Sequence, residues 1–192
     1  MPRYTAPVRD ALFNIREVLN LDAHAHLPGF ENATPDIVEA VLVEAGKFAA
    51  EVLAPLNASG DAQGCTRHAD GSVTTPAGFR EAHRLFREGG WGTLTAPVEF
   101  GGQALPRVIG FAVEEFMSAA NQSFAMYPGL TNGAVSALLV KGSPDLQRTF
   151  VPRMVANEWL GTMNLTEPHC GTDLGLMRSR AEPQADGTYK VS

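Results

Sequence analysis

The chain has 192 residues, of which 44% are hydrophobic and 19% are charged, a balance that predicts a globular protein and excludes a disordered one. The formal net charge of −6 argues against a nucleic-acid surface, which needs clustered Lys and Arg. Two cysteines are too few for a disulfide framework and indicate a reducing compartment. No apolar run approaches the ~20 residues of a membrane helix, and the N-terminus lacks the apolar core of a signal peptide. We therefore expect a soluble cytoplasmic protein that binds neither nucleic acid nor membrane.

Apolar residues recur at helical spacing through most of the chain. Thr34 and Ser143 are favoured N-caps, and each precedes a proline at the first helical position. Pro55 is expected to end one helix, and Pro152 to kink or shorten another. The predicted helices cover residues 6–20, 35–54, 76–88, 106–120, 130–141 and 144–154, and the predicted loops include 56–75 and 121–129.

Two pairs of metal-ligating residue types lie in the predicted loops. His24 and His26 form one pair, and Cys65 and His68 form the other. A zinc site needs about four ligands, and neither pair has further ligands near it in the sequence. No metal site is therefore predicted. The glycine-rich segment 90–102 lacks a phosphate-binding pattern and is interpreted as a structural connection.

The composition changes near the C-terminal end. Residues 158–165 favour a strand, and residues 177–182 and 188–191 predict a hairpin that turns at Asp186-Gly187. A hairpin alone is only marginally stable. The expected fold is therefore mainly α: a helical bundle domain followed by the truncated start of a β domain. The predicted parts are an N-terminal extension at 1–33, a helical domain at 34–157 and the β segment at 158–192.

The junction between these parts carries the most specific motif. Residues 163–173 read Met-Asn-Leu-Thr-Glu-Pro-His-Cys-Gly-Thr-Asp and resemble the signature of the acyl-CoA dehydrogenase family. Upstream, residues 92–102 resemble the family's Gly-Pro-Glu-aromatic-Gly-Gly element. Both elements occur in the family's order within residues 34–192. The leading residues 4–13 are similar to the extra segment of the larger members, the 3-methylthiopropionyl-CoA dehydrogenase-like group.

The resemblance implies a FAD-dependent oxidoreductase. Such an enzyme converts an acyl-CoA to the 2,3-enoyl-CoA and passes electrons to an electron-transfer flavoprotein. It also implies a middle β domain, a C-terminal helical domain that holds the catalytic glutamate, and a homo-oligomer at full length. No catalytic residue is therefore expected in this chain, which alone should be inactive and bind FAD weakly or not at all. Glu167 is expected to be structural.

The resemblance also implies which residues bind ligands. For FAD these are Leu165 and Thr166 at the flavin ring, and Gly171 and Thr172 at the pyrophosphate. For the acyl-CoA they are Met126, Tyr127, Gly129 and Thr172. For Thr166 and Thr172, the alternative to ligand binding is that their hydroxyls only cap the turn.

Three other interpretations stay open. The chain could come from an acyl-CoA oxidase or a flavin monooxygenase relative, or it could be a non-catalytic helical interaction module. A nucleophilic pair of Cys170 and His169 is disfavoured because neither residue has the partners that such a pair needs, and Cys170 is expected to be a small buried filler.

Overall fold

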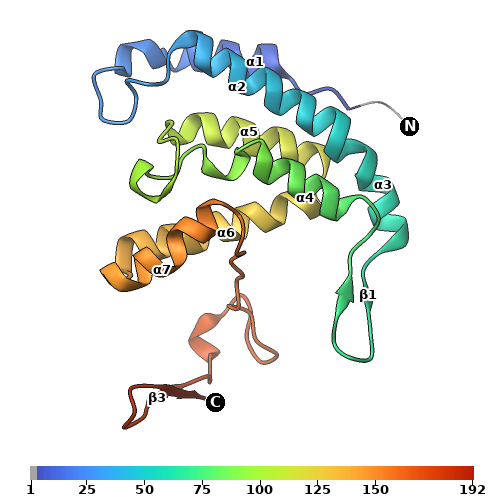
Figure 1. Ribbon diagram of the computed structural model, residues 1–192, viewed down its shortest axis with the longest axis vertical. Helices are drawn as coiled ribbons and strands as arrows, with labels where there is room; N and C mark the ends of the chain where they lie inside the picture. Colours follow the sequence, from blue (N-terminus) through green and yellow to red (C-terminus); the bar gives the residue numbers. More distant parts are fainter. Residues whose placement is uncertain (1–3) are drawn as a thin grey trace. The chain divides into compact units, whose positions relative to one another are not determined.

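The computed structural model describes residues 4–192 (Figure 1). The chain divides into a helical unit that ends at Thr162 and a C-terminal unit, Met163–Ser192, and each is described by itself. The helical unit contains α1 Val8–Phe13, η1 Asn14–Val18, η2 Leu21–His24, α2 Pro35–Phe48, η3 Ala49–Leu53, α3 Ala54–Gln63, β1 Thr66–Arg67, β2 Val73–Thr74, α4 Phe79–Glu88, η4 Trp91–Thr93, η5 Val98–Phe100, α5 Arg107–Ala120, α6 Gln122–Lys141 and α7 Pro144–Val155. The C-terminal unit contains η6 Leu174–Leu176, β3 Ala181–Pro183 and β4 Tyr189–Val191.

The helices of the helical unit pack side by side. In Figure 1, α1 lies along α2, α2 contacts α5, α5 lies along α6, and α6 lies along α7. The mainly helical architecture predicted from the sequence is thus confirmed.

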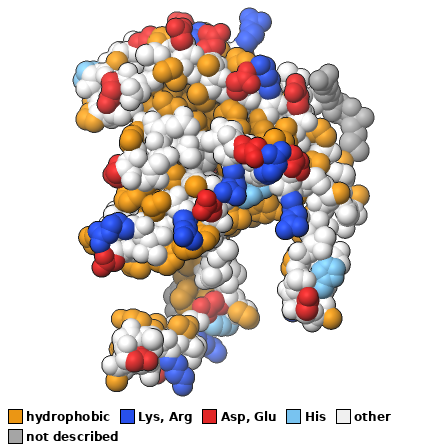
Figure 2. All heavy atoms as spheres, viewed as in Figure 1, with side chains coloured by type: hydrophobic (Ala, Val, Ile, Leu, Met, Phe, Trp, Pro, Cys, Tyr) orange, Lys and Arg blue, Asp and Glu red, His pale blue; other side chains and the backbone are white. Residues whose placement is uncertain are grey.

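On the face seen in Figure 2, basic and acidic side chains are interspersed. Within residues 4–192, no helix combines the length and the apolar character that crossing a membrane requires.

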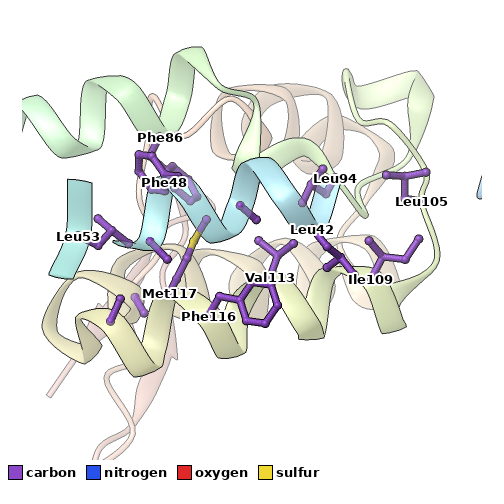
Figure 3. Close-up of a cluster of buried hydrophobic side chains, with 14 of the residues drawn as sticks. Leu42, Phe48, Leu53, Phe86, Leu94, Leu105, Ile109, Val113, Phe116 and Met117 are labelled. Atoms are coloured by element: carbon purple, nitrogen blue, oxygen red, sulfur yellow. The ribbon is translucent and has the colours of Figure 1, made fainter. Parts of the chain in front are cut away.

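The core lies between α2, α4, α5 and the start of α6. Figure 3 shows Leu42 and Phe48 of α2 facing side chains of α5, among them Val113, Phe116 and Met117. A second buried cluster joins α6 to α7 through Val135, Val151, Met154 and Val155. Buried side chains of both α5 and α6 belong to the first cluster and fix the positions of these two helices relative to each other.

The prediction that a helix ends at Pro55 is wrong. The helix runs without interruption from α2 through η3 into α3, which ends at Gln63. In η3 the turn is widened, because the Ala54 N–H bonds to the carbonyl oxygen of Ala49, five residues back. Pro55 directly follows this widened turn, whose altered hydrogen-bond register accommodates the missing N–H. The predicted loop at 56–75 is accordingly helix as far as Gln63, and the rest includes the short β1–β2 hairpin.

The predicted loop at 121–129 is also wrong, because α6 begins at Gln122. Its N-cap is Asn121, whose side chain accepts a hydrogen bond from the Phe124 N–H at 3.1 Å. This cap starts the helix eight residues before the expected position at Leu130. Pro152 does not shorten α7, which continues to Val155. The predicted caps of α7 are confirmed, since the Ser143 hydroxyl oxygen accepts from the Leu146 N–H.

The C-terminal unit is sparse in regular structure. The predicted strand at 158–165 is absent, and no strand of the described residues pairs with that segment. A strand needs a neighbour to satisfy its backbone groups, and this explains the difference. The hairpin is confirmed: β3 and β4 pair antiparallel with Ala181 opposite Val191, and Gly187 takes the left-handed conformation in the turn.

Candidate functional site

The signature motif folds into a tight two-residue turn. The Cys170 N–H donates to the carbonyl oxygen of Glu167 at 3.1 Å, and the Glu167 N–H donates to that of Cys170 at 2.9 Å. Pro168 and His169 occupy the two central positions. Proline suits the first of these because its ring already holds the φ angle that such a turn requires. The two residues that flank the turn, Thr166 and Gly171, are thereby brought opposite each other.

Thr166 and Gly171 lie in direct proximity. A Cβ atom placed on Gly171 would lie 3.5 Å from the Thr166 Cγ2 atom. Thr166 and Thr172 are exposed, and Gly171 is half-buried. The predicted cofactor residues Leu165, Thr166, Gly171 and Thr172 therefore form a single surface on the two arms of one turn.

This surface presents backbone donors that are free to bind a ligand. Among the described residues, the N–H groups of Leu165, Thr166, Gly171 and Thr172 have no intramolecular acceptor. Backbone N–H groups are strong donors that must find an acceptor in solvent or in a ligand. Carbonyl and phosphate oxygens of a cofactor are acceptors of the kind that such a loop accommodates.

The two threonine hydroxyls do not cap the turn within the described residues, where neither makes a side-chain hydrogen bond. Capping is performed by Asp173, whose Oδ1 accepts from the Gly175 N–H at 3.0 Å and begins η6. The hydroxyls of Thr166 and Thr172 are thus available to a ligand, like the neighbouring amides.

The inside of the turn holds Glu167, His169 and Cys170. Glu167 directs its Oε2 toward His169, and Cys170 is only 7% exposed. The burial of Cys170 agrees with the small buried filler expected at this position. Glu167 points toward His169 within the turn, and the structural role expected for it stays a prediction.

The helical unit contains a cavity of about 400 Å³ between α5, α6 and the segment 91–97. Its walls combine apolar side chains with a few polar ones, namely Thr95, Arg107, Glu114, Asn132 and Ser136. A mostly apolar cavity of some 300–1,000 Å³ with few polar groups is typical of a small-molecule site.

Of the predicted acyl-binding residues in the helical unit, Gly129 lines this cavity. Met126 is 51% exposed and lies outside the lining. Tyr127 packs its ring on Phe124 at 5.7 Å between centroids, and burial raises the pKa of its phenol. The structure therefore brings one of these three residues to the cavity and leaves the other two away from it.

Sequence reasoning missed the polar residues of the cavity. Glu114 and Arg107 lie on the same face of α5, and the Glu114 carboxylate faces Gly129 across the gap between the helices, 3.5 Å from where a Cβ of residue 129 would lie. Charged residues on a mostly apolar helix, Glu115 among them, are the only signal that could have drawn attention to these two.

Comparison with known proteins places these features in a family context. The family described as "Acyl-CoA dehydrogenase, N-terminal domain" matches residues 36–158. The chain is 40% identical over 189 residues to 3-methylmercaptopropionyl-CoA dehydrogenase from Ruegeria pomeroyi, a match that covers 98% of this chain and 32% of that protein. The chain thus spans about a third of the length of this relative.

Solved structures show the same fold. Butyryl-CoA dehydrogenase from Megasphaera elsdenii superposes with a TM-score of 0.65 at 20% identity, over 81% of this chain and 39% of that one. An acyl-CoA dehydrogenase complexed with FAD from Bacillus anthracis gives 0.64 at 23% identity, over 81% and 25%. At these identities the likeness is one of fold.

Proposed function

The chain belongs to the acyl-CoA dehydrogenase family, and from this premise we propose that the protein containing it oxidises an acyl-CoA thioester to the 2,3-enoyl-CoA with FAD as cofactor. The observation that carries the proposal is the open surface on the signature turn. Four neighbouring residues, Leu165, Thr166, Gly171 and Thr172, present backbone N–H groups without an intramolecular acceptor among the described residues.

These donors fit the acceptor atoms of FAD, which supplies the acceptor for the substrate's β-hydride when bound. Leu165 and Thr166 would donate to the carbonyl oxygens of the flavin ring. Gly171 and Thr172 would donate to the pyrophosphate, where the absence of a side chain at Gly171 leaves the backbone accessible. The tight turn at Pro168-His169 places the two donor pairs on its two arms.

We assign the acyl part of the substrate to the cavity in the helical unit. Its volume of about 400 Å³ is adequate for a short acyl chain, and Gly129 keeps its wall open. The base that removes the substrate's α-proton is assigned to a glutamate outside this chain, and an electron-transfer flavoprotein is proposed as the electron acceptor.

The experiment that tests this function is an assay of the whole protein with a panel of acyl-CoA thioesters and a dye acceptor. The panel includes butyryl-CoA and the thioether substrate in the name of the Ruegeria relative. Reduction of the dye by at least one thioester is the expected result. Turnover that consumes O₂ in place of the dye would indicate an oxidase or a monooxygenase. No turnover and no bound flavin would leave a non-catalytic interaction module.

A further inference from the structure

Three side chains with different metal-ligating atoms converge inside the signature turn. The carboxylate of Glu167, the imidazole of His169 and the thiol of Cys170 place one ligand atom each within 4.8 Å of one another. The Glu167 Oε2 and His169 Nε2 atoms are separated by 3.2 Å. The turn's two backbone hydrogen bonds create this convergence, because they bring residues three apart in the sequence to the same side.

The Glu167 Oε2 atom receives no hydrogen bond from the other two side chains of the cluster. His169 Nε2 accepts a hydrogen bond from the Arg178 N–H at 3.0 Å, so this nitrogen carries a lone pair and its ring proton is on Nδ1. It therefore has no proton to donate to Glu167. The Glu167 Oε2 atom is buried and has no hydrogen-bond partner in the described residues. A buried carboxylate oxygen without a donor is costly, and a cation at this point would remove that cost.

We propose that Glu167, His169 and Cys170 bind one divalent transition-metal ion of the zinc class. Ligands that stand ~2.0–2.1 Å from a tetrahedral zinc lie roughly 3.3 Å from each other, which matches the Glu167–His169 separation of 3.2 Å. A thiolate and an imidazole select zinc and its neighbours over calcium and magnesium. Water fills the fourth position.

The binding step has a defined proton balance. The Cys170 thiol loses its proton to solvent as its sulfur becomes a thiolate ligand, and one proton is released for each metal ion bound. The His169 Nε2 atom, which accepts from the Arg178 N–H, offers its lone pair to the metal. That lone pair turns from the Arg178 amide to the metal, so the Arg178 N–H loses its acceptor when the ion binds.

The site does not depend on the proposed dehydrogenase activity. It uses only three side chains inside the turn, whereas the flavin proposal uses the backbone of the four flanking residues. No metal site is predicted from the sequence. The convergence depends on the tight turn, which places Glu167 and Cys170 opposite each other.

The test is a titration of the 192-residue chain with Co²⁺ followed by competition with Zn²⁺. The account predicts one equivalent of Co²⁺, with an ultraviolet thiolate-to-cobalt charge-transfer band and visible bands of tetrahedral intensity, all displaced by Zn²⁺. Cys170→Ser and His169→Gln are expected to weaken binding at least tenfold and to abolish or shift the charge-transfer band. Cys65→Ser is the matched control, since it removes the other, exposed thiol. It should leave the Co²⁺ affinity and the charge-transfer band unchanged.

A Co²⁺ complex without a thiolate band in the unsubstituted chain would overturn the proposal, and this measurement needs no variant to fold. A band that survives Cys170→Ser but disappears in Cys65→Ser would do the same, because it would place the metal at Cys65. The Arg178 amide gives an independent readout, since its hydrogen exchange should accelerate on metal binding in the unsubstituted chain. An unchanged exchange rate in the metal-loaded chain would contradict ligation by His169 Nε2.

Discussion

The Asn121 side chain donates a hydrogen bond from Nδ2 to the carbonyl oxygen of Leu53, 3.2 Å away, while its Oδ1 accepts from the Phe124 N–H. One buried amide therefore joins the widened turn of η3 to the first turn of α6. Asn121 is 1% exposed, so both partners depend on it.

Replacing Asn121 should consequently destabilise the helical unit. Asn121→Ala removes the N-cap of α6 and leaves the Leu53 carbonyl without a partner, and we expect a loss of about 2–3 kcal/mol in the free energy of unfolding. Asn121→Ser is expected to lose less, because a serine hydroxyl can cap the helix. Urea unfolding followed by circular dichroism measures both variants. Equal losses of unfolding free energy in the two variants would show that the N-cap of α6 makes no separate contribution to stability.

The N-terminal segment packs closely on α2 at Gly46. A Cβ at this position would lie 2.9 Å from Val8 Cγ2 and 3.2 Å from Ala6 Cβ. Gly46→Ala should therefore destabilise the chain by about 1 kcal/mol or more, through overpacking. The cost is expected to be smaller in a Val8→Ala background, where the contacting methyl group is gone. Urea midpoints of the four chains in this double-mutant cycle test the contact, and a coupling free energy of zero would show that Val8 does not press on Gly46.

His83 should make stability depend on pH. Burial, followed by the charge of Arg87, lowers the pKa of His83 below its ordinary value of 6.5. The folded state thus favours the neutral imidazole, whose stabilising effect is complete above pH 6.5 and is lost as the pH falls through the lowered pKa. Comparing the urea midpoints of the wild type and His83→Asn between pH 8 and pH 5 isolates this contribution. The wild type is expected to lose more stability on acidification, and parallel curves would refute the effect.

The cavity should set the length of the acyl chain that the whole protein accepts. Gly129→Leu would place a side chain against the Glu114 carboxylate and narrow the space between α5 and α6. We expect KM to rise more for long acyl-CoAs than for butyryl-CoA. Met126→Leu is the control, because Met126 lies at an exposed position on the same helix outside the cavity. It should leave the KM for long acyl-CoAs and the KM for butyryl-CoA unchanged. A uniform loss for all chain lengths would remove the cavity from the substrate site.

The sequence predicted the features that are determined locally. Ser143-Pro144 marks the start of α7, Gly90 follows the end of α4 in the left-handed conformation, and Asp186-Gly187 marks the hairpin turn. Each depends on the conformational preference of one or two residues, which the sequence states directly.

Features that depend on packing could not be predicted in this way. Pro55 is a helix breaker by its own preference, but the widened turn before it absorbs the missing hydrogen bond. Asn121 starts α6 because a distant carbonyl, that of Leu53, holds its amide. Likewise, the periodicity of α5 reveals its apolar face but not that Glu114 lies opposite Gly129.

The flavin content of the whole protein tests the central claim most directly. The account predicts one FAD per chain in the wild type, and this FAD should be bleached by anaerobic addition of an acyl-CoA. Gly171→Val should lose much of its affinity for FAD, because the valine side chain would crowd the free amides beside Thr166. Thr188→Val, in the hairpin turn of the same unit, should keep its FAD. A whole protein that is folded but binds no FAD, or a Gly171→Val variant with wild-type affinity for FAD, would contradict the assignment of the signature turn to the cofactor.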